Sequence, residues 1–247
     1  MWFVKFMHYL KFGTSKKFLV FLHGWGADMN SFLWLKDFFA DDHTLLFIDF
    51  AGFGKTAEPS VAWSVCDYAN DLKSLLDSFE IDSIIFVAHS FGGRVALKFL
   101  SCYQDIFDVR GLCLVDSAGI LPRRNILYWW KIYRFKRLKR RAVKKVELRS
   151  KLDEFGSSDY KKLSDTMKNT FVKVVNEDLS NAAKSVGCKT LIVWGKKDKE
   201  TKLYMAKKLH KFIKQSKLVI FRDAGHFSFL EKKEDFVIVL DTFIKSL

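Results

Sequence analysis

The chain of 247 residues contains only two prolines and four cysteines, and it has no long unbroken apolar segment. A helix that spans a bilayer needs about 18 or more consecutive apolar residues, so we expect no transmembrane helix. The cysteines are scattered along the chain and form no C-x-x-C pair; they are Cys66, Cys102, Cys113 and Cys188. This scatter argues against a zinc site and favours free, mostly buried thiols in a reducing compartment. We therefore predict a cytoplasmic protein.

Several other signals are also missing. The sequence has no P-loop and no G-x-G-x-x-G after a strand, and the glycines at 52–54 are too few for a dinucleotide site. We therefore predict no cofactor and no metal. Residues 1–8 lack the basic start and the unbroken apolar core of a signal peptide, and we interpret their rough alternation as a strand.

Positive charge is what the chain has in excess, with a formal net charge of +14. Such a field attracts acidic proteins, nucleic acid or anionic membranes. No nucleic-acid-binding module is present, which disfavours nucleic acid as a partner. A compositional bias, with abundant lysine and phenylalanine and little proline, accounts for the overall charge equally well.

Short apolar runs alternate with helical patterns along most of the chain. The strands that we expect cover residues 18–22, 44–48, 83–88, 112–115, 190–194 and 218–221. Helical spacing of apolar residues is found at 30–39, 67–79, 91–102 and 233–246. This alternation predicts an α/β fold, in which a mostly parallel sheet is flanked by helices on both faces.

Residues 121–187 break this rhythm, because they contain no convincing strand and have the pattern of several helices. Residues 123–151 hold thirteen Lys or Arg and a single acid, Glu147. Apolar residues recur through this basic segment at helical spacing, which predicts an amphipathic basic helix. We predict a core domain of residues 1–120 and 188–247, with 121–187 inserted as a helical cap above the carboxyl ends of the strands.

Ser90 lies at an expected turn between a strand and a helix, with small residues on both sides. Ala88 stands where the G-x-S-x-G pattern has its first glycine, and Gly92 supplies the second. A tight turn of this kind strains the backbone at the serine and exposes its hydroxyl above the sheet. The helix that starts there favours developing negative charge. Ser90 is therefore the candidate nucleophile.

A serine hydroxyl needs a neighbouring base. His226 follows the last expected strand, where a loop can hold an imidazole over the carboxyl edge of the sheet. Asp198 follows the preceding strand and can accept the other imidazole N–H. Asp116, at the end of its own strand, is the alternative orienting acid.

The segment His23-Gly24-Trp25-Gly26 is a glycine-rich loop after an early strand. Glycines allow backbone N–H groups to approach a ligand closely. We expect the N–H groups of Trp25 and Phe91 to form an oxyanion hole. His23 and His89 are interpreted as structural.

These motifs together resemble the α/β-hydrolase family with a helical cap. They are HGWG at 23–26, D-x-x-G-x-G at 49–54, A-H-S-F-G-G at 88–93, G-x-x-D at 195–198 and G-H at 225–226. The resemblance implies a triad of Ser90, Asp198 and His226 in the family's chain order. Two subgroups are especially similar: carbon–carbon bond hydrolases of 2-hydroxy-6-oxo-dienoates, and carboxylesterases of pimeloyl-carrier-protein methyl ester.

The function that we expect is hydrolysis of a small-molecule carboxylic ester, or of a related acyl bond, through an acyl-enzyme. One alternative is carbon–carbon bond hydrolysis. A second is hydrolysis of an acyl ester on an acidic carrier protein that docks on the basic cap. A third is peripheral binding to an anionic membrane, with catalysis secondary.

Overall fold

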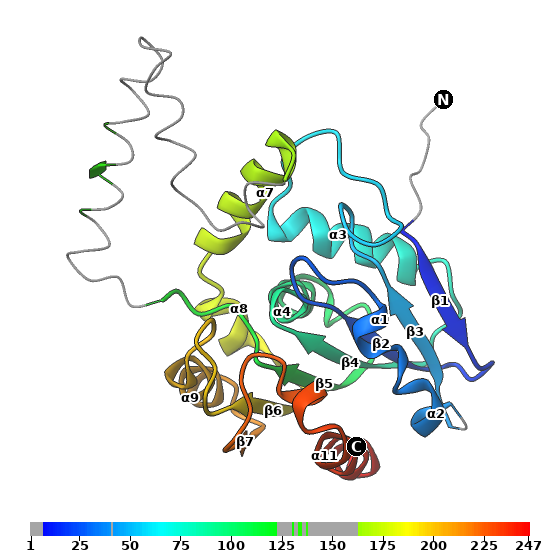
Figure 1. The fold of residues 1–247 in the computed structure, drawn as a ribbon. Coiled ribbons are helices and arrows are strands. Elements are labelled where there is room, and N and C mark those ends of the chain that lie inside the picture. Colours follow the sequence, from blue (N-terminus) through cyan, green and yellow to red (C-terminus); the bar gives the residue numbers. More distant parts are fainter. Residues whose placement is uncertain (1–6, 41, 123–129, 131–132, 135–136, 138–162) are drawn as a thin grey trace, which may run out of the picture.

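The computed structural model describes residues 7–40, 42–122, 130, 133–134, 137 and 163–247. Seven strands form one sheet in the order β1-β3-β2-β4-β5-β6-β7 (Figure 1). Their bounds are β1 Tyr9–Phe12, β2 Lys17–Leu22, β3 Thr44–Ile48, β4 Ser83–His89, β5 Val109–Val115, β6 Lys189–Gly195 and β7 Ser216–Phe221. Strand β1 is antiparallel to β3, and the other neighbouring strands are parallel.

The parallel register brings the carboxyl ends of distant strands to one edge of the sheet. His89 at the end of β4 pairs with Val115 at the end of β5, and Val115 pairs with Val193 of β6. Gly195, the last residue of β6, pairs with Phe221 of β7. The turns after β4, β5, β6 and β7 therefore lie next to one another, although up to 136 residues separate them in the chain.

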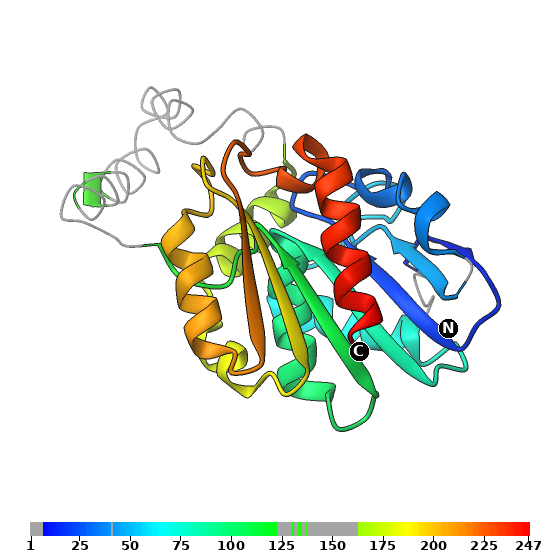
Figure 2. The same ribbon diagram turned by 90° about the horizontal axis from the view of Figure 1, so that it is seen from below.

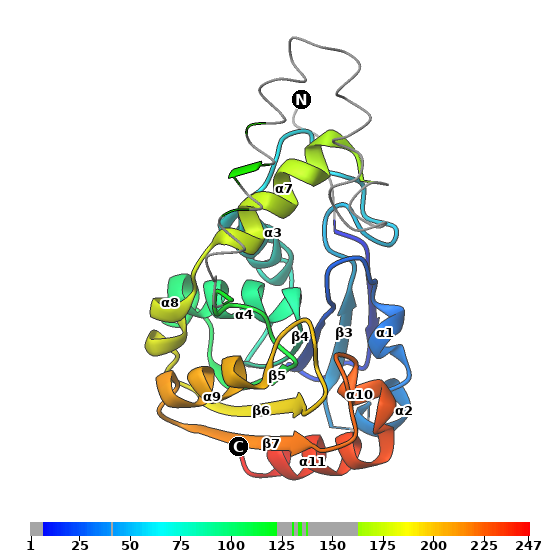
Figure 3. The ribbon, with the colours of Figure 1, turned by 60° about the vertical axis from the view of Figure 1, so that its left-hand side comes forward.

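Alternation along the strands divides the core into two apolar layers. Val20 and Leu22 face one layer, whereas Leu19 and Phe21 face the other. The first layer packs against α3 Val65–Leu76, α4 Phe91–Tyr103, α8 Ser180–Ser185 and α9 Leu203–Phe212. The second packs against α1 Asn30–Leu33, α2 Lys36–Phe39, α10 Ser228–Glu231 and α11 Lys233–Lys245. Figure 3 shows these two sets of helices on opposite sides of the sheet, and Figure 2 shows α11 lying across one face.

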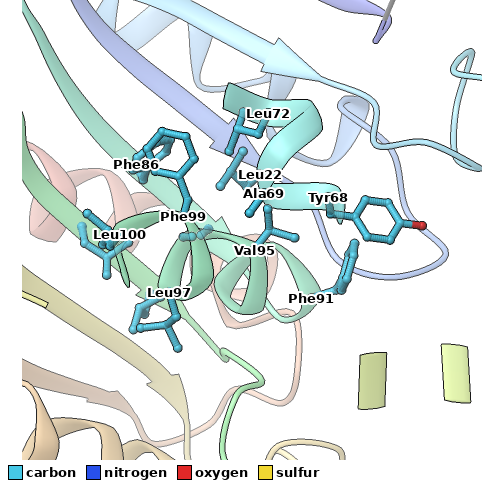
Figure 4. Packing of buried hydrophobic residues seen from close by; sticks show 14 of the residues in the cluster. Leu22, Tyr68, Ala69, Leu72, Phe86, Phe91, Val95, Leu97, Phe99 and Leu100 are labelled. Atoms are coloured by element: carbon cyan, nitrogen blue, oxygen red, sulfur yellow. The ribbon is translucent and has the colours of Figure 1, made fainter. Parts of the chain in front are cut away.

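Helix α4 is the central helix of the first layer, where Tyr68 and Leu72 of α3 pack beside Phe91, Val95 and Phe99 of α4 (Figure 4). The start of α4 runs very close to the sheet. A Cβ atom on Gly92 would lie 2.1 Å from the carbonyl oxygen of Leu22, so only glycine fits there. This close approach fixes the first turn of α4, and with it the residue that precedes the helix.

The structure confirms the α/β fold and the six strands predicted from residue 18 onward, but it differs at the start of the chain and at some helices. The region 30–39 forms two short helices that meet at Trp34 and Leu35, and Phe32, Leu35 and Phe39 are all buried in the second layer. The first strand begins only at Tyr9, so the strand predicted over residues 1–8 is wrong at 7–8 and lies outside the described residues at 1–6. Helix α9 was not predicted.

The predicted cap is described only in part. Its last third contains α7 Asp165–Asn176 and α8, in agreement with the helical pattern there. The basic segment 123–151 lies outside the described residues except at 130, 133–134 and 137. Among the described residues, no helix is long and apolar enough to cross a membrane.

Candidate active site

Ser90 occupies the sharp turn between β4 and α4. Its backbone has φ 48° and ψ −107°, a conformation that residues other than glycine rarely adopt. The turn is held in place because the Ser90 N–H donates to the carbonyl of Val115 and the Ser90 carbonyl accepts from the Ala118 N–H, both at 3.0 Å. Ser90 is the N-cap residue of α4, but its hydroxyl does not cap the helix. The predicted strained turn is confirmed, and the hydroxyl is left for another partner.

That partner is His226, in the loop between β7 and α10. Its Nε2 lies 3.1 Å from Ser90 Oγ, and its Nδ1 lies 2.8 Å from Asp198 Oδ2. A carboxylate only accepts hydrogen bonds, so Nδ1 carries the hydrogen and Nε2 is free to accept the serine O–H. The structure thus brings together the three side chains that the sequence analysis selected.

The carboxylate of Asp198 is held by three further hydrogen bonds. The backbone N–H groups of Glu200 and Thr201 donate to Oδ1 at 2.8 and 2.9 Å, and the Thr201 hydroxyl donates to Oδ2 at 2.6 Å. Burial by itself raises the pKa of Asp198, but the hydrogen bonds from His226 and Thr201 outweigh it and lower the pKa below its ordinary value. Asp198 is therefore ionised and fixed in orientation.

The same contacts act on His226 in the opposite sense. Burial lowers the pKa of His226, whereas the hydrogen bond and charge of Asp198 raise it, with smaller contributions from Glu200 and Asp116. The net pKa lies above the ordinary value of 6.5. Glu200 Oε2 is 3.3 Å from His226 Nε2, and the Glu200 side chain is largely exposed.

Asp116, the alternative orienting acid, has different partners. Its Oδ1 accepts from the Gly195 N–H at 2.7 Å, and its Oδ2 accepts from the N–H and the hydroxyl of Ser228 at 3.1 and 2.5 Å. Burial raises the pKa of Asp116 to about 7. The carboxylate that reaches His226 is therefore that of Asp198, and Asp116 ties the ends of β5 and β6 to α10.

His89, next to Ser90, supports the His226 loop. Its Nε2–H donates to the carbonyl of His226 at 2.8 Å, and its ring packs against Phe227 and Phe229. Burial lowers the pKa of His89 to about 3, so the ring is neutral. Its Nδ1 faces the glycine-rich loop, where a Cβ atom on Gly24 would lie 2.8 Å away. These contacts agree with a structural role.

His23 holds the glycine-rich loop in the same way. Its Nδ1–H donates to the carbonyl of Gly24 at 2.7 Å, and its Nε2 accepts from the Phe50 N–H at 3.0 Å. Trp25 then packs against Phe91 with ring centroids 5.4 Å apart. The two residues expected to form an oxyanion hole are thus in contact beside Ser90.

A cavity of about 380 Å³ opens directly above these residues. Its polar part contains Ser90, His226, His89 and Glu200, together with the backbone of Gly24, and both Trp25 and Phe91 also line it. The N–H of Phe91 is in the first turn of α4, where a helix leaves its donors without an internal partner. Among the described residues, neither Trp25 N–H nor Phe91 N–H donates a hydrogen bond.

Much of the remaining wall of the cavity comes from α7 and from a residue two positions before it. These residues are Leu163, Phe171, Val174 and Val175. Phe171 also packs against Trp25, with ring centroids 5.1 Å apart. The described part of the predicted cap therefore forms an apolar wall of the cavity that Ser90 also lines. Within the described residues, no group of three or more His, Cys, Asp or Glu side chains could hold a metal ion.

Sequence reasoning missed three residues of this site: Arg94, Glu200 and Thr201. Two of them had a signal in the chain. Thr201 follows Asp198 by three residues, a spacing at which a hydroxyl and backbone N–H can return to a carboxylate. Arg94 follows Ser90 by one turn of the same helix, which places both near the same end of α4.

Comparison with known proteins gives a consistent result. Residues 19–238 match the model of a family described as "Alpha/beta hydrolase family". The AB hydrolase superfamily protein YisY of Bacillus subtilis is 25% identical over 87% of this chain and 87% of its own length.

Two solved structures show the same fold. An esterase (EaEST) from Exiguobacterium antarcticum superposes with a TM-score of 0.75 at 21% identity, covering 97% of this chain and 95% of that one. The meta-cleavage product hydrolase CumD from Pseudomonas fluorescens gives a TM-score of 0.70 at 16% identity, covering 97% of this chain and 94% of that one.

Proposed function

The chain belongs to the alpha/beta hydrolase family, and we propose that it is a serine hydrolase that cleaves carboxylic esters through an acyl-enzyme. The observation that carries this proposal is the continuous hydrogen-bonded chain from Ser90 through His226 to Asp198, which opens on a cavity. A nucleophile, a base and a group that orients the base are the parts that acyl transfer requires.

In the first half-reaction, Ser90 Oγ attacks the ester carbonyl while its proton moves to His226 Nε2. Asp198 is ionised and hydrogen-bonded to Nδ1, so it stabilises the imidazolium that forms. The oxyanion of the tetrahedral intermediate would accept from the N–H groups of Trp25 and Phe91. Each donor of this kind is worth about 3 kcal/mol of transition-state stabilisation.

His226 then returns the proton to the alcohol oxygen, and the alcohol leaves. In the second half-reaction a water molecule gives its proton to His226 Nε2 and attacks the acyl carbon, and collapse of the intermediate restores Ser90. The apolar α7 wall, with Phe171 and Val174, would contact the acyl chain and exclude water from it.

The direct test compares hydrolysis of p-nitrophenyl butyrate by the wild-type chain and by Ser90→Ala. We expect the substitution to reduce kcat by on the order of 10³-fold or more, because no other hydroxyl is hydrogen-bonded to His226 Nε2 among the described residues. A fluorophosphonate probe should label the wild-type chain and not the variant.

Ser101→Ala is the matched control, since Ser101 is an exposed serine on α4, the helix that begins directly after Ser90. It should keep both activity and labelling. Equal hydrolysis by the wild-type chain and Ser90→Ala would contradict the proposal.

The other sequence-based alternatives remain predictions. Carbon–carbon bond hydrolysis would use the same cavity and nucleophile. Docking of an acidic carrier protein or of an anionic membrane would rest on the basic segment 123–151, most of which lies outside the described residues.

A further inference from the structure

Arg94 is a buried cation at the wall of the candidate active-site cavity. Only 5% of its surface is exposed, although arginines are almost never buried to this degree unless they are paired. It lies on α4, one helical turn after Ser90, and both residues line the cavity. A positive charge is therefore held close to the nucleophile.

The partners of this guanidinium are neutral. Nη1 donates to the carbonyl of Glu177 at 2.8 Å, and Nη2 lies 3.4 Å from the carbonyl of Val175. Among the described residues, no carboxylate lies within ion-pair distance of Arg94. The nearby Glu177 carboxylate is bonded to Lys98 at 2.9 Å instead. A guanidinium has five N–H donors, so most of them remain available.

Arg94 nevertheless stays charged at neutral pH. Burial lowers its pKa to about 10, while Glu177 and Asp178 act in the opposite direction. Val175, whose carbonyl lies beside Nη2, also lines the cavity, so the guanidinium lies at the α7 wall. The rest of that wall is apolar.

The carboxylate of Glu200 also lines the cavity, where it lies beside His226. Glu200 Oε2 is 3.3 Å from His226 Nε2, the atom that would protonate the departing alcohol. A carboxylate on the alcohol portion would face Glu200 and be repelled. A carboxylate at the far end of the acyl portion would instead pass along the apolar α7 wall toward Arg94.

We propose that Arg94 binds a carboxylate carried by the acyl portion of the substrate, so that the substrates are half-esters of dicarboxylic acids. The assignment of the acyl side rests on the proposed function. A charge-assisted, two-pronged hydrogen bond between guanidinium and carboxylate is geometrically specific, and it would also fix the depth to which the acyl chain enters.

Arg94 also holds the C-terminal end of α7, because the two carbonyls that it contacts lie there. The test must therefore separate charge recognition from support of the cavity wall. Two esters of equal chain length do so: monomethyl adipate, which carries a carboxylate, and methyl hexanoate, which does not. Loss of wall support affects both esters, whereas loss of charge recognition affects only the first.

We expect the wild-type chain to prefer monomethyl adipate. Arg94→Met should lower kcat/KM for monomethyl adipate by on the order of 10- to 100-fold more than for methyl hexanoate. Arg94→Lys should retain part of the preference because it keeps the charge. Lys98→Met, which removes the next cation along α4, should leave the ratio of the two rates unchanged.

Equal losses on both esters in Arg94→Met would overturn the proposal and assign Arg94 to support of α7 alone. If the wild-type chain hydrolyses neither ester, the proposed function fails first, and binding decides the role of Arg94. Calorimetric titration of monomethyl adipate into Ser90→Ala and into Ser90→Ala/Arg94→Met should then show at least tenfold weaker binding to the double variant. Equal affinities, or no binding to either, would refute carboxylate recognition.

Discussion

Two neighbouring turns at the sheet edge each carry a buried aspartate, Asp116 after β5 and Asp198 after β6. Both accept several hydrogen bonds, and burial raises the pKa of each. For Asp116 the partners are neutral N–H and O–H groups, and its pKa rises to about 7. For Asp198 one partner is the imidazole of His226, and the net pKa falls below the ordinary value.

Burial and position at a strand end therefore do not distinguish an acid that orients a catalytic base from an acid with a structural role. What distinguishes them is a partner, His226, that would gain charge in the proposed reaction. Asp198 faces such a partner, whereas Asp116 faces groups that stay neutral. Thr201 joins the two turns, since its hydroxyl lies 2.6 Å from Asp198 Oδ2 and 2.9 Å from the carbonyl of Asp116.

The largest effect on activity is expected for Asp198→Asn. An amide can no longer stabilise the imidazolium and can favour the wrong tautomer of His226, so kcat should fall by on the order of 10³- to 10⁴-fold. Hydrolysis of p-nitrophenyl butyrate measures the fall, and urea unfolding shows whether the fold is kept. A variant that retains more than about a tenth of the wild-type kcat would show that Asp198 does not orient the base.

Asp116→Asn should reduce stability, whereas it should change activity little. The amide keeps an acceptor for one donor but places its own NH₂ against another, which costs about 1–3 kcal/mol of unfolding free energy. Activity at saturating substrate should stay within about tenfold of wild type, because Asp116 does not contact His226.

The stability deficit of Asp116→Asn should also depend on pH. The folded pKa of Asp116 is about 7, above the ordinary 3.8, so between these values the folded carboxyl holds a proton that the unfolded chain has released. The wild-type chain therefore loses stability relative to the variant as pH rises from 3.8 to about 7. Urea unfolding should show a larger deficit at pH 5 than at pH 8, and a deficit that grows with pH would contradict the raised pKa.

The smallest effect on activity is expected for Glu200→Gln, which removes the charge of the second acid near His226. The proposed mechanism requires neutral His226, so the rate should fall as pH drops through the pKa of this group. Loss of the Glu200 charge lowers that pKa and should move the acid limb of the pH–rate profile to lower pH. At pH 8 the two rates should differ by less than about threefold, because Glu200 is largely exposed. An acid limb that stays in place would show that solvent screens this charge completely.

The positions of Ser90, Asp198 and His226 were predictable because each follows a short apolar strand, and parallel strands bring such ends together. The spacing of Arg94 from Ser90 predicted that the two lie near each other, but the partners of Arg94 and the position of Glu200 depend on contacts between distant segments. The Arg94 guanidinium, for example, meets a carbonyl 83 residues away. The local pattern of apolar and polar residues does not predict such a contact.

Prediction of the strands and helices was limited in the same way. The two-layer sheet follows from strands that are apolar throughout, such as β3, in which every residue is buried. Strand β1 has three exposed residues out of four, so it lacks the burial pattern that identifies a strand. Helix α9 did have a signal, because Met205, Ala206 and Leu209 are buried at helical spacing among the surrounding lysines.

The backbone conformation of Ser90 has a consequence for how this chain can evolve. Its φ of 48° suits glycine better than any residue with a β-carbon, so every folded molecule carries a conformational cost of about 1 kcal/mol or more at this one position. Replacement of the serine by glycine would relax the turn and stabilise the folded state. That replacement would also remove the hydroxyl that is hydrogen-bonded to His226, so stability and the proposed reactivity favour different residues at this position.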